Sequence, residues 1–339
     1  MRALIVGTER YGSLGQMCHD ALTEIGVESH AFDYRREARI HGIGSQVPGL
    51  RRVMRLWKQY RMNQHLVRQA ARIQPDVVLV LKGELISPST LSAVNSRTQA
   101  RLVNWNPDNP FNPLNTTPAL LKSIPVYDLH FTWHQALADR LEKAGAPRVA
   151  YLPFGYDPRL HHPVELTSNE RAALATDVCF CGTWEPKRER LLAHVTDFGL
   201  GIWGNGWENL ALDSPLRACW RGPAIYGDDL SSVYSASRIV LNFLREQNRD
   251  AHNMRTFETP ATGAFQLTTR SRQVAAWFTE GREIGCFESP QELARQVKYY
   301  LGHEAERRQV AQAGYQRLKR NTHTYAERMQ RVMDEVARL

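Results

Sequence analysis

The sequence predicts two α/β domains, each built on a parallel β-sheet. Strand–loop–helix patterns repeat on both sides of a Pro/Gly-rich crossing at residues 153–157, and this alternation is typical of parallel sheets covered by helices. The length of 339 residues allows each domain its own core. Between two apolar strands, residues 241–267 hold an arginine-rich loop and a short helix, and we expect the rest of the chain to be organised around this stretch.

Composition places the chain among ordinary globular proteins. Apolar residues make up 42% and charged residues 23%, and no run of about 18 apolar residues is present. The first apolar stretch is too short for a signal peptide, so we expect a cytoplasmic protein, either free or peripheral at a membrane. The net charge of +8 favours an anionic partner: a sugar nucleotide, a lipid phosphate, a membrane surface or nucleic acid.

The first domain begins with a strand at residues 2–6 and a loop that carries Tyr11 and Gly12 before a helix. Its glycines do not spell the dinucleotide-binding fingerprint Gly-x-Gly-x-x-Gly. The loop therefore either contacts an acceptor substrate or is only a tight turn, and the sequence leaves both open.

Two further strands of this domain end in charged side chains. Lys82 follows an apolar strand at 76–81, and Asp108 lies between two prolines after a strand at 101–105. Open α/β sheets bind ligands at the carboxyl ends of their strands, so both side chains are candidates for acceptor binding. Alternatively, Asp108 caps its own turn. We expect the next strand at 125–131.

A long helix at residues 49–73 combines helical apolar spacing with many cations. The apolar set includes Leu50 and Trp57, and the basic set includes Arg51 and Arg55. Such a helix either lies on an anionic membrane, or meets a lipid-linked acceptor, or presents a solvated face.

The second domain repeats the pattern of strand, glycine loop and helix. A strand at 177–181 precedes Gly182 and Thr183, with Arg188 in the following helix. A glycine at a strand end allows a phosphate to approach the backbone, and a cation one turn later neutralises it. Alternatively, Arg188 lies on a solvated helix face. A second strand at 200–203 ends at Gly204.

The central stretch supplies the most specific signal. A strand ends at Asn242, the loop carries Arg245, and a short helix carries Arg255 and Glu258 one turn apart. The start of such a helix offers free N–H groups that suit a phosphate, and the Glu258 carboxylate is placed to accept from a ribose diol. We therefore predict a nucleotide-sugar site. The alternatives are a helix-dipole partner for Glu258 and a surface ion pair for Arg255.

The runs Asn-Met-Arg-Thr-Phe-Glu at 253–258 and Ala-Thr-Gly-Ala-Phe at 261–265 resemble the CgeB-like (spore-maturation) glycosyltransferases, which are related to the family 4 retaining enzymes. The resemblance continues through Lys-Gly at 82–83 and Trp-Asn-Pro-Asp at 105–108. It implies the GT-B fold, with Rossmann-like domains at 1–155 (acceptor) and 156–322 (donor) and a helix at 323–339 that packs back on the first domain. The implied activity transfers a sugar from a nucleoside-diphosphate sugar to a hydroxyl group.

The resemblance also assigns roles to residues. Glu258 matches the second carboxylate of the family's Glu-x7-Glu pair, which binds donor ribose, and Asp250 stands where the family has the first glutamate. The implied catalytic residues are Asp108, Asp250 and Arg255, and the implied acceptor-binding residues are Tyr11, Gly12, Lys82 and Asp108. The implied donor-binding residues are Gly182, Thr183, Arg188, Gly204, Asn242, Arg245, Asn253, Met254, Arg255 and Glu258.

We expect the transfer to be retaining and to need neither a metal ion nor another cofactor. The chain contains no Asp-x-Asp motif, so arginines and helix termini are expected to offset the charge of the leaving diphosphate. The acceptor is left open among a glycan, a lipid-linked sugar, a protein and nucleic acid. The alternatives to a transferase are a sugar-nucleotide epimerase, a phosphorylase, and a module that binds a sugar nucleotide or nucleic acid without turnover.

Overall fold

The computed structural model describes residues 1–39, 48–246, 249–321 and 323–339. The chain divides into unit 1, Met1–Pro153 with Tyr325–Leu339, and unit 2, Phe154–Thr324. The sequence analysis places the boundaries after residues 155 and 322, and residue 322 itself lies outside the described residues. None of the described helices is long and apolar enough to cross a membrane.

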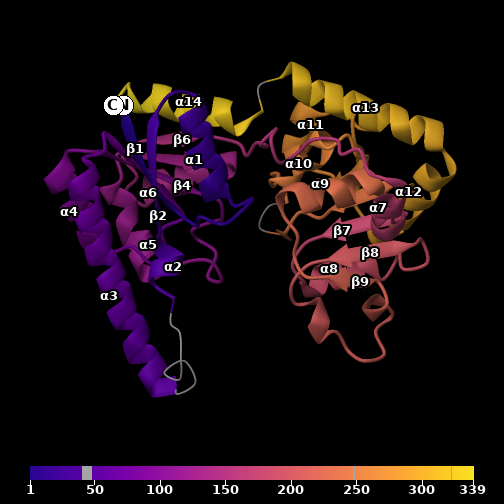
Figure 1. The fold of residues 1–339 in the computed structure, drawn as a ribbon, viewed down its shortest axis with the longest axis horizontal. Helices are drawn as coiled ribbons and strands as arrows, with labels where there is room; N and C mark the ends of the chain where they lie inside the picture. Colours follow the sequence, from indigo (N-terminus) through magenta and orange to yellow (C-terminus); the bar gives the residue numbers. More distant parts are fainter. Residues whose placement is uncertain (40–47, 247–248, 322) are drawn as a thin grey trace. The chain divides into compact units, whose positions relative to one another are not determined.

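Unit 1 is built on a six-stranded parallel sheet with the order β2-β1-β3-β4-β5-β6 (Figure 1). Continuous apolar runs such as Val-Val-Leu-Val-Leu in β3 are buried along their whole length, as expected for strands covered on both faces. The strands are β1 (Arg2–Gly7), β2 (Glu28–Asp33), β3 (Val77–Leu81), β4 (Arg101–Asn106), β5 (Leu129–Thr132) and β6 (Val149–Tyr151).

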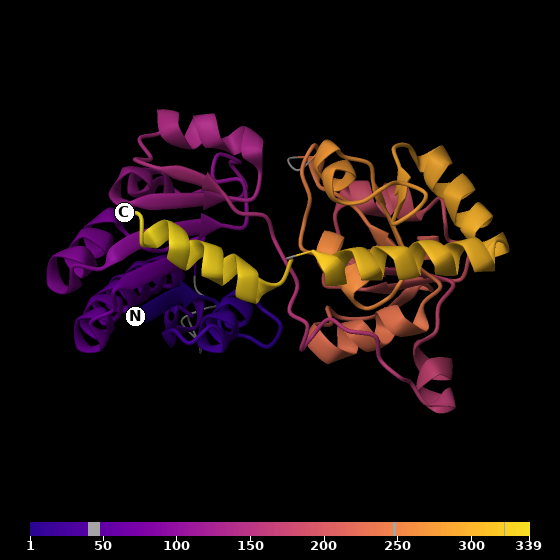
Figure 2. The same ribbon diagram turned by 90° about the horizontal axis from the view of Figure 1, so that it is seen from above.

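Helices cover both faces of this sheet. Leu4 and Val6 pack with side chains of α3 and α4, whereas α14 packs against α1 (Figure 2). The helices of unit 1 are α1 (Leu14–Glu24), α2 (Tyr34–Glu37), α3 (Pro48–Ile73), α4 (Pro88–Thr98), α5 (Pro118–Ser123), α6 (Ala138–Lys143) and α14 (Tyr325–Val336), with 3-10 turns η2 (Ile124–Val126) and η3 (Gln135–Leu137). The side chains of Leu50 and Arg51, part of the predicted α3 pattern, lie outside the described residues.

One predicted strand of unit 1 is wrong at its start. The sequence predicts a strand over 125–131, but Pro125 lies in the 3-10 turn η2 and the strand β5 begins at Leu129. Proline has no N–H to donate to a neighbouring strand, so Pro125 is better accommodated in a turn than in the interior of the sheet.

Unit 2 contains a second six-stranded parallel sheet, with the order β12-β11-β10-β7-β8-β9. Successive residues of β7 and β10 point to opposite faces: Val178 and Ile239 pack in one core cluster, Cys179 and Val240 in another. The strands are β7 (Val178–Cys181), β8 (Leu200–Trp203), β9 (Trp220–Gly222), β10 (Ile239–Asn242), β11 (Gln266–Thr269) and β12 (Gly285–Phe287).

Helix α9 contributes to the core on one face of this sheet, and α12 and α13 contribute to the core on the other. The helices of unit 2 are α7 (Ser168–Leu174), α8 (Pro186–Leu192), α9 (Gly227–Ala236), α10 (Arg255–Ala261), α11 (Arg272–Trp277), α12 (Pro290–Gly302) and α13 (Glu304–Arg320), with 3-10 turns η4 (Trp207–Asn209) and η5 (Pro215–Arg217).

Each sheet has one point at which the chain reverses the direction in which it adds strands. In unit 1 this switch point lies between β1 and β3, because β2 is added on one side of β1 and the later strands on the other. In unit 2 it lies between β7 and β10. Loops that leave neighbouring strands at a switch point diverge, and the crevice between them is where open α/β sheets bind ligands.

Candidate functional site

The loops after β7 and β8 in unit 2 pack closely because both carry glycine. A Cβ on Gly204 would lie 2.0 Å from the carbonyl oxygen of Gly182, and a Cβ on Gly182 would lie 2.8 Å from the Phe180 ring. Trp207 Nε1 donates a hydrogen bond of 2.8 Å to the same Gly182 carbonyl. Both predicted glycines therefore hold the backbone at the carboxyl ends of two adjacent strands in a fixed position.

Two predicted arginines meet beside this loop and share one carboxylate. Arg188 Nη1 donates to the carbonyl of Thr183 at 2.7 Å and lies 3.4 Å from Glu185 Oε1. Arg245, from the loop after β10, donates its Nε–H to the same Glu185 oxygen at 2.6 Å. The loops on the two sides of the switch point thus place two guanidinium groups around a single negative charge.

The environment of Arg188 is that of a cation with too few counter-charges. Burial lowers the pKa of Arg188 to about 10; Glu185 opposes this shift, whereas the cations Arg245 and Arg255 add to it. The Arg188 side chain is only 13% exposed, so solvent screens it weakly. A bound anion would supply the missing negative charge, which makes this cluster a candidate phosphate or diphosphate site.

Glu258 lies deeper, with its carboxylate held by protein groups. One oxygen pairs with Arg255 and the other lies 3.7 Å from His161 Nε2, and the Glu258 side chain is 2% exposed. Burial lowers the pKa of His161, which keeps its ring neutral although Glu258 opposes the shift. Burial also lowers the pKa of Arg255, but Tyr234 and Glu258 outweigh burial and raise it. The predicted ribose contact of Glu258 stays a prediction.

A pair of asparagines ties the end of β10 to the start of α10. Asn242 and Asn253 exchange two side-chain hydrogen bonds, of 3.1 and 2.7 Å. The Asn253 side-chain oxygen also accepts from the Thr256 N–H at 3.2 Å, while Met254 is the N-cap residue of α10. These three predicted donor-binding residues therefore fix the loop that positions Arg255, whose carbonyl accepts from Gln266 Nε2 at 2.6 Å.

Asp250 has a different environment from the arginine cluster. It lies on the surface, where its carboxylate pairs with Arg272 at 3.5 Å and both side chains are more than half exposed. Residues 247 and 248 of the same loop lie outside the described residues. The structure therefore does not bring Asp250 together with Arg188 and Arg245, and its predicted contact with the donor sugar remains a prediction.

The predicted acceptor residues lie at the switch point of unit 1. Lys82 Nζ and Asp108 Oδ2 form an ion pair of 2.8 Å at the ends of β3 and β4, so the Asp108 side chain pairs with Lys82 instead of capping its turn. Tyr11 is about half exposed in the loop after β1, and Gly12, at φ 69°, donates its N–H to Gln16 Oε1 at 3.0 Å. All four come from loops that flank β1, β3 and β4.

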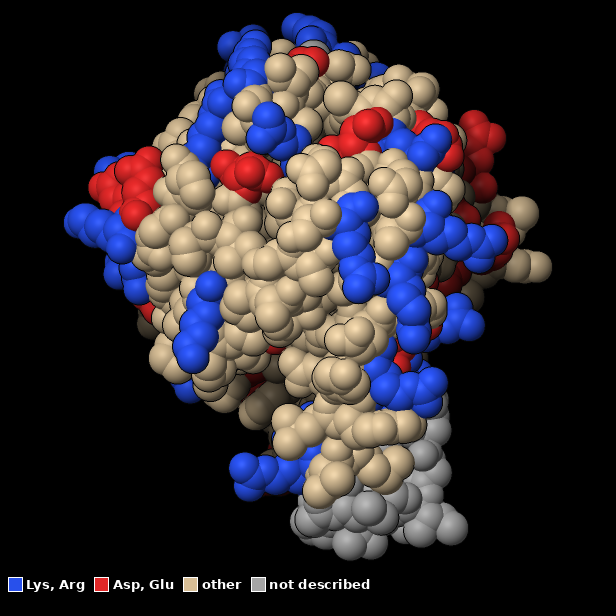
Figure 3. All heavy atoms as spheres, turned by 90° about the vertical axis from the view of Figure 1, so that its left-hand side faces the viewer, with Lys and Arg blue, Asp and Glu red and all other residues tan. Residues whose placement is uncertain are grey.

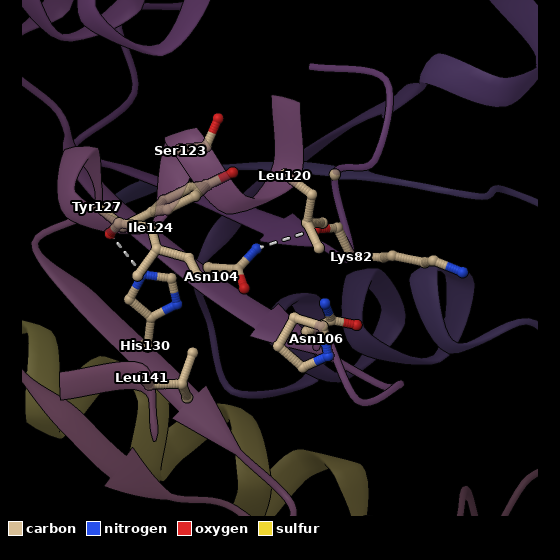
Figure 4. A pocket seen from close by; sticks show the side chains of 11 residues that line it. Lys82, Asn104, Asn106, Leu120, Ser123, Ile124, Tyr127, His130 and Leu141 are labelled. Carbon is tan, nitrogen blue, oxygen red and sulfur yellow. Dashed lines mark hydrogen bonds between the residues drawn. The ribbon is translucent and has the colours of Figure 1, made fainter. Parts of the chain in front are cut away.

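A small cavity is lined by Lys82 together with polar and apolar side chains (Figure 4). Asn104 Nδ2 donates to the Lys82 carbonyl at 3.3 Å, and His130 Nε2 donates to the Ile124 carbonyl at 2.8 Å. Burial lowers the pKa of His130 to about 4, so its ring is neutral at pH 7. The Ser123 hydroxyl also lines the cavity. The cavity has room for about one water molecule, which suits a structural role better than substrate binding.

Three residues that contact the predicted site residues were not themselves predicted from the sequence. Glu185, which joins Arg188 to Arg245, has a weak sequence signal: it stands three residues before Arg188, at the N-cap of α8. His161 faces Glu258 from a segment almost a hundred residues earlier, and no spacing pattern indicates that contact. Trp207 follows the predicted glycine turn directly, and an indole after such a turn could have been considered as a loop anchor.

A comparison with protein families gives a match to the second half of the chain. Residues 187–334 match the sequence profile of a family described as glycosyl transferase-like. The matched range contains Arg188, Arg245 and the whole central stretch. A comparison with curated protein sequences gave no match.

Several solved structures share the fold over the whole chain. They include HepE from Anabaena in complex with UDP-glucose (TM-score 0.68, 12% identity, 100% of both chains covered). Sucrose-phosphate synthase from Thermosynechococcus elongatus gives a TM-score of 0.72 at 13% identity, with 99% of both chains covered. An α,α-trehalose-phosphate synthase (UDP-forming) from Burkholderia vietnamiensis gives 0.62 at 13% identity, also with 99% of both chains covered. The chain therefore has the GT-B fold, as the sequence predicts.

Among the described residues, no group of three or more His, Cys, Asp or Glu side chains is arranged to hold a metal ion. The predicted independence from metal is a statement about activity and stays a prediction.

Proposed function

We propose that the protein is a glycosyltransferase that moves a sugar from a nucleoside-diphosphate sugar to a hydroxyl group. The observation that carries this proposal is the arginine cluster at the switch point of unit 2, where Arg188 and Arg245 share Glu185. An excess of partly buried positive charge at the carboxyl ends of parallel strands suits the diphosphate of a sugar nucleotide. The match of residues 187–334 to a glycosyl transferase-like family supports the same activity.

In the proposed reaction, the bond between the anomeric carbon and the donor phosphate oxygen breaks. The acceptor oxygen forms the new glycosidic bond, and its proton goes to the departing phosphate. Charge develops on the diphosphate as it leaves, and fixed guanidinium groups stabilise that charge without reorganising. We propose that Arg188 and Arg245 do this, together with Arg255 and the backbone at Asn253 and Met254, so that no divalent cation is required.

The remaining roles follow the predicted assignments. Glu258 binds the donor ribose once Arg255 turns its guanidinium toward the diphosphate, and Asp250 contacts the donor sugar. If the leaving phosphate takes the acceptor proton, the acceptor attacks on the face from which the phosphate departs, so the configuration is retained. In unit 1, Lys82 and Asp108 orient the acceptor hydroxyl, with Tyr11 and Gly12 beside them.

We propose UDP as the first nucleotide to test, because HepE is described in complex with UDP-glucose and the trehalose-phosphate synthase is described as UDP-forming. The acceptor is a hydroxyl group of a glycan, a lipid-linked sugar, a protein or a nucleic acid.

A thermal-shift panel of UDP, GDP, dTDP and CMP with their sugar conjugates tests the donor. A ligand at about 100 times its dissociation constant adds about 2.7 kcal/mol of stability, which is a measurable shift. Arg188→Ala should reduce the shift to about a third, whereas Arg190→Ala, on an exposed position of the same helix α8, should retain it. A panel without any shift would contradict the donor site.

Release of the nucleoside diphosphate that depends on an added acceptor, in the presence of EDTA, then tests the transfer. An absolute need for a divalent metal ion would contradict the proposed role of the arginines. Conversion of the sugar nucleotide without an acceptor would identify an epimerase instead of a transferase.

A further inference from the structure

The first half of α3 in unit 1 carries an apolar stripe on its surface. Val53, Leu56, Trp57 and Tyr60 are each between 50% and 64% exposed. Their spacing of i, i+3, i+4 and i+7 places all four side chains on one face of the helix. We call this set the α3 stripe. Large apolar side chains gathered on one exposed helix face indicate a contact surface, in contrast to single exposed residues.

The α3 stripe is distinct from the face by which the helix joins its domain. In the second half of α3, Met62, Leu66, Val67 and Ala70 are buried in the core of unit 1. The first half extends beyond the remainder of unit 1 (Figure 1). Four large apolar residues therefore lie on a part of the helix that contributes little to the core.

The stretch of chain that contains α3 carries the whole net charge of the protein. From residue 38 to residue 75 the sequence contains eight arginine or lysine residues and no aspartate or glutamate. These eight cations equal the formal net charge of +8, so the rest of the chain carries the two signs in equal number. The excess positive charge of the protein is therefore concentrated in and next to α3.

Two cations on the first half of α3 flank the stripe: Arg52 and Arg61 lie about 90° from its centre around the helix, whereas Arg55 and Lys58 lie on the opposite side. Arg52, Arg55, Lys58 and Arg61 recur every third residue, and the Arg61 guanidinium lies 4.8 Å from the centre of the Trp57 ring. Figure 3 shows unit 1 from the side of α3, with blue side chains next to tan surface on the described part of the protrusion. Apolar residues on one face with arginine and lysine beside them are typical of helices that lie in a membrane interface.

We infer that the α3 stripe docks on an anionic lipid surface, with Trp57 and Leu56 inserted among the headgroups and the flanking cations bound to lipid phosphates. A nucleic acid would satisfy the cations but would leave Val53 and Leu56 without an apolar partner. A second copy of the chain would bring two strongly basic helices together, which like-charge repulsion disfavours. Anionic lipid satisfies both features at once.

Co-sedimentation of the full-length protein with vesicles tests this docking. We expect binding to vesicles of phosphatidylcholine mixed with phosphatidylglycerol, and weak or no binding to phosphatidylcholine alone. The double variant Leu56→Glu/Trp57→Glu should lower the vesicle partition coefficient by more than about fiftyfold, because it removes the inserted side chains and adds repulsion from the lipid.

Two matched controls separate the stripe from a general change in charge. Leu114→Glu/Leu212→Glu alters two other exposed leucines and makes the same change in net charge, so it should bind nearly as well as the unchanged protein. Arg52→Gln/Arg61→Gln should lower the partition by roughly twenty-fivefold, at about fivefold per cation near an anionic surface. Arg282→Gln/Arg320→Gln, two exposed arginines of unit 2, should change it far less.

The docking is overturned if the unchanged protein does not bind anionic vesicles. It is equally overturned if Leu56→Glu/Trp57→Glu and Leu114→Glu/Leu212→Glu bind them with the same partition coefficient. It is also overturned if Leu56→Glu/Trp57→Glu leaves vesicle binding intact and instead dissociates a dimer in sedimentation velocity, or abolishes binding to duplex DNA. Vesicle binding requires no donor, so Arg188→Ala should bind vesicles as the unchanged protein does. Failure of the proposed transferase activity is thereby distinguishable from failure of the docking.

Discussion

The two switch points of this protein have the same topology but different charge. In unit 1, two cations near the ends of β3 and β4 each have their own carboxylate: Lys82 pairs with Asp108, and Arg35 pairs with Glu84. In unit 2, Arg188 and Arg245 share Glu185. Paired charges leave little attraction for an anion, whereas shared ones leave an excess of positive charge.

In the proposed function, this difference assigns two binding tasks to one sheet topology. A sugar nucleotide carries its charge on the diphosphate, and the excess cationic charge of unit 2 would meet it. An acceptor hydroxyl is neutral, and the paired groups of unit 1 suit hydrogen bonding to it. The fold supplies the crevice in both units, and the loops decide what binds there.

The largest expected effect concerns the ion pair between Arg255 and Glu258, which belongs to the proposed donor site. Arg255→Met would leave the Glu258 carboxylate buried without a cation, which should destabilise unit 2 by about 3 to 5 kcal/mol. The double variant Arg255→Met/Glu258→Gln should recover most of this stability without recovering donor binding. Urea unfolding compares the two variants. Equal stability of the single and double variants would show that the pair does not stabilise unit 2.

An intermediate effect is a fall in the stability of unit 1 at acidic pH. It arises from His130, whose buried ring donates a hydrogen bond to the Ile124 carbonyl. Its pKa is about 4 in the folded protein, against about 6.5 when unfolded. The unfolded state therefore binds more protons below pH 6.5, and this contribution to stability is lost as the pH falls from 6.5 toward 4. At pH 5 the loss is about 2 kcal/mol.

His130→Gln should remove this part of the pH dependence. Urea unfolding at pH 7 and pH 5 measures the free energy of unfolding of both proteins. An equal fall in stability on acidification, with and without the histidine, would contradict the assignment to His130.

A smaller effect on UDP affinity is expected from the loss of Arg245, one of the two arginines that share Glu185. Arg245 is 39% exposed, so Arg245→Ala should weaken UDP binding by about 1 kcal/mol, less than the loss for the more buried Arg188. Arg249→Ala is the matched control, since Arg249 is 75% exposed and lies 3.9 Å from Glu246. Isothermal titration calorimetry measures each dissociation constant, and equal losses for both variants would argue against a local site.

The smallest expected effect, on UDP binding, comes from removing the Lys82–Asp108 ion pair, and it tests most specifically whether the two switch points differ. Lys82→Met/Asp108→Asn, which neutralises the ion pair of unit 1, should change the dissociation constant for UDP by less than about 0.5 kcal/mol. The same variant should lower the rate of transfer to an acceptor. A loss of UDP affinity as large as that of Arg188→Ala would mean that the two switch points do not differ in the way described.

Much of the fold was predictable because its central strands are continuous apolar runs. The runs at β3, β7 and β10 identify buried parallel strands by themselves. Edge positions were harder: β2 (Glu-Ser-His-Ala-Phe-Asp) has only Phe32 fully buried, so it lacks that signal. Because Pro125 lies in a 3-10 turn, β5 begins only at Leu129, and an apolar pattern alone does not reveal this later start.

The candidate site was predictable only in part. Gly182 and Arg188 were identified because they follow a strand end, and topology guarantees that such residues gather at one edge of the sheet. The pairing of Arg245 with Glu185, and of His161 with Glu258, depends on loop conformation and long-range packing. Local spacing carries no information about those contacts.

The central claim is that the arginine cluster of unit 2 binds a diphosphate. Titration calorimetry with UDP and with uridine measures what the two phosphates contribute to binding. We expect UDP to bind far more tightly than uridine. Arg188→Ala should reduce UDP affinity by about 2 kcal/mol, roughly thirtyfold, whereas Arg190→Ala should not. Equal affinities for UDP and uridine, or an unchanged UDP affinity in Arg188→Ala, would contradict the claim.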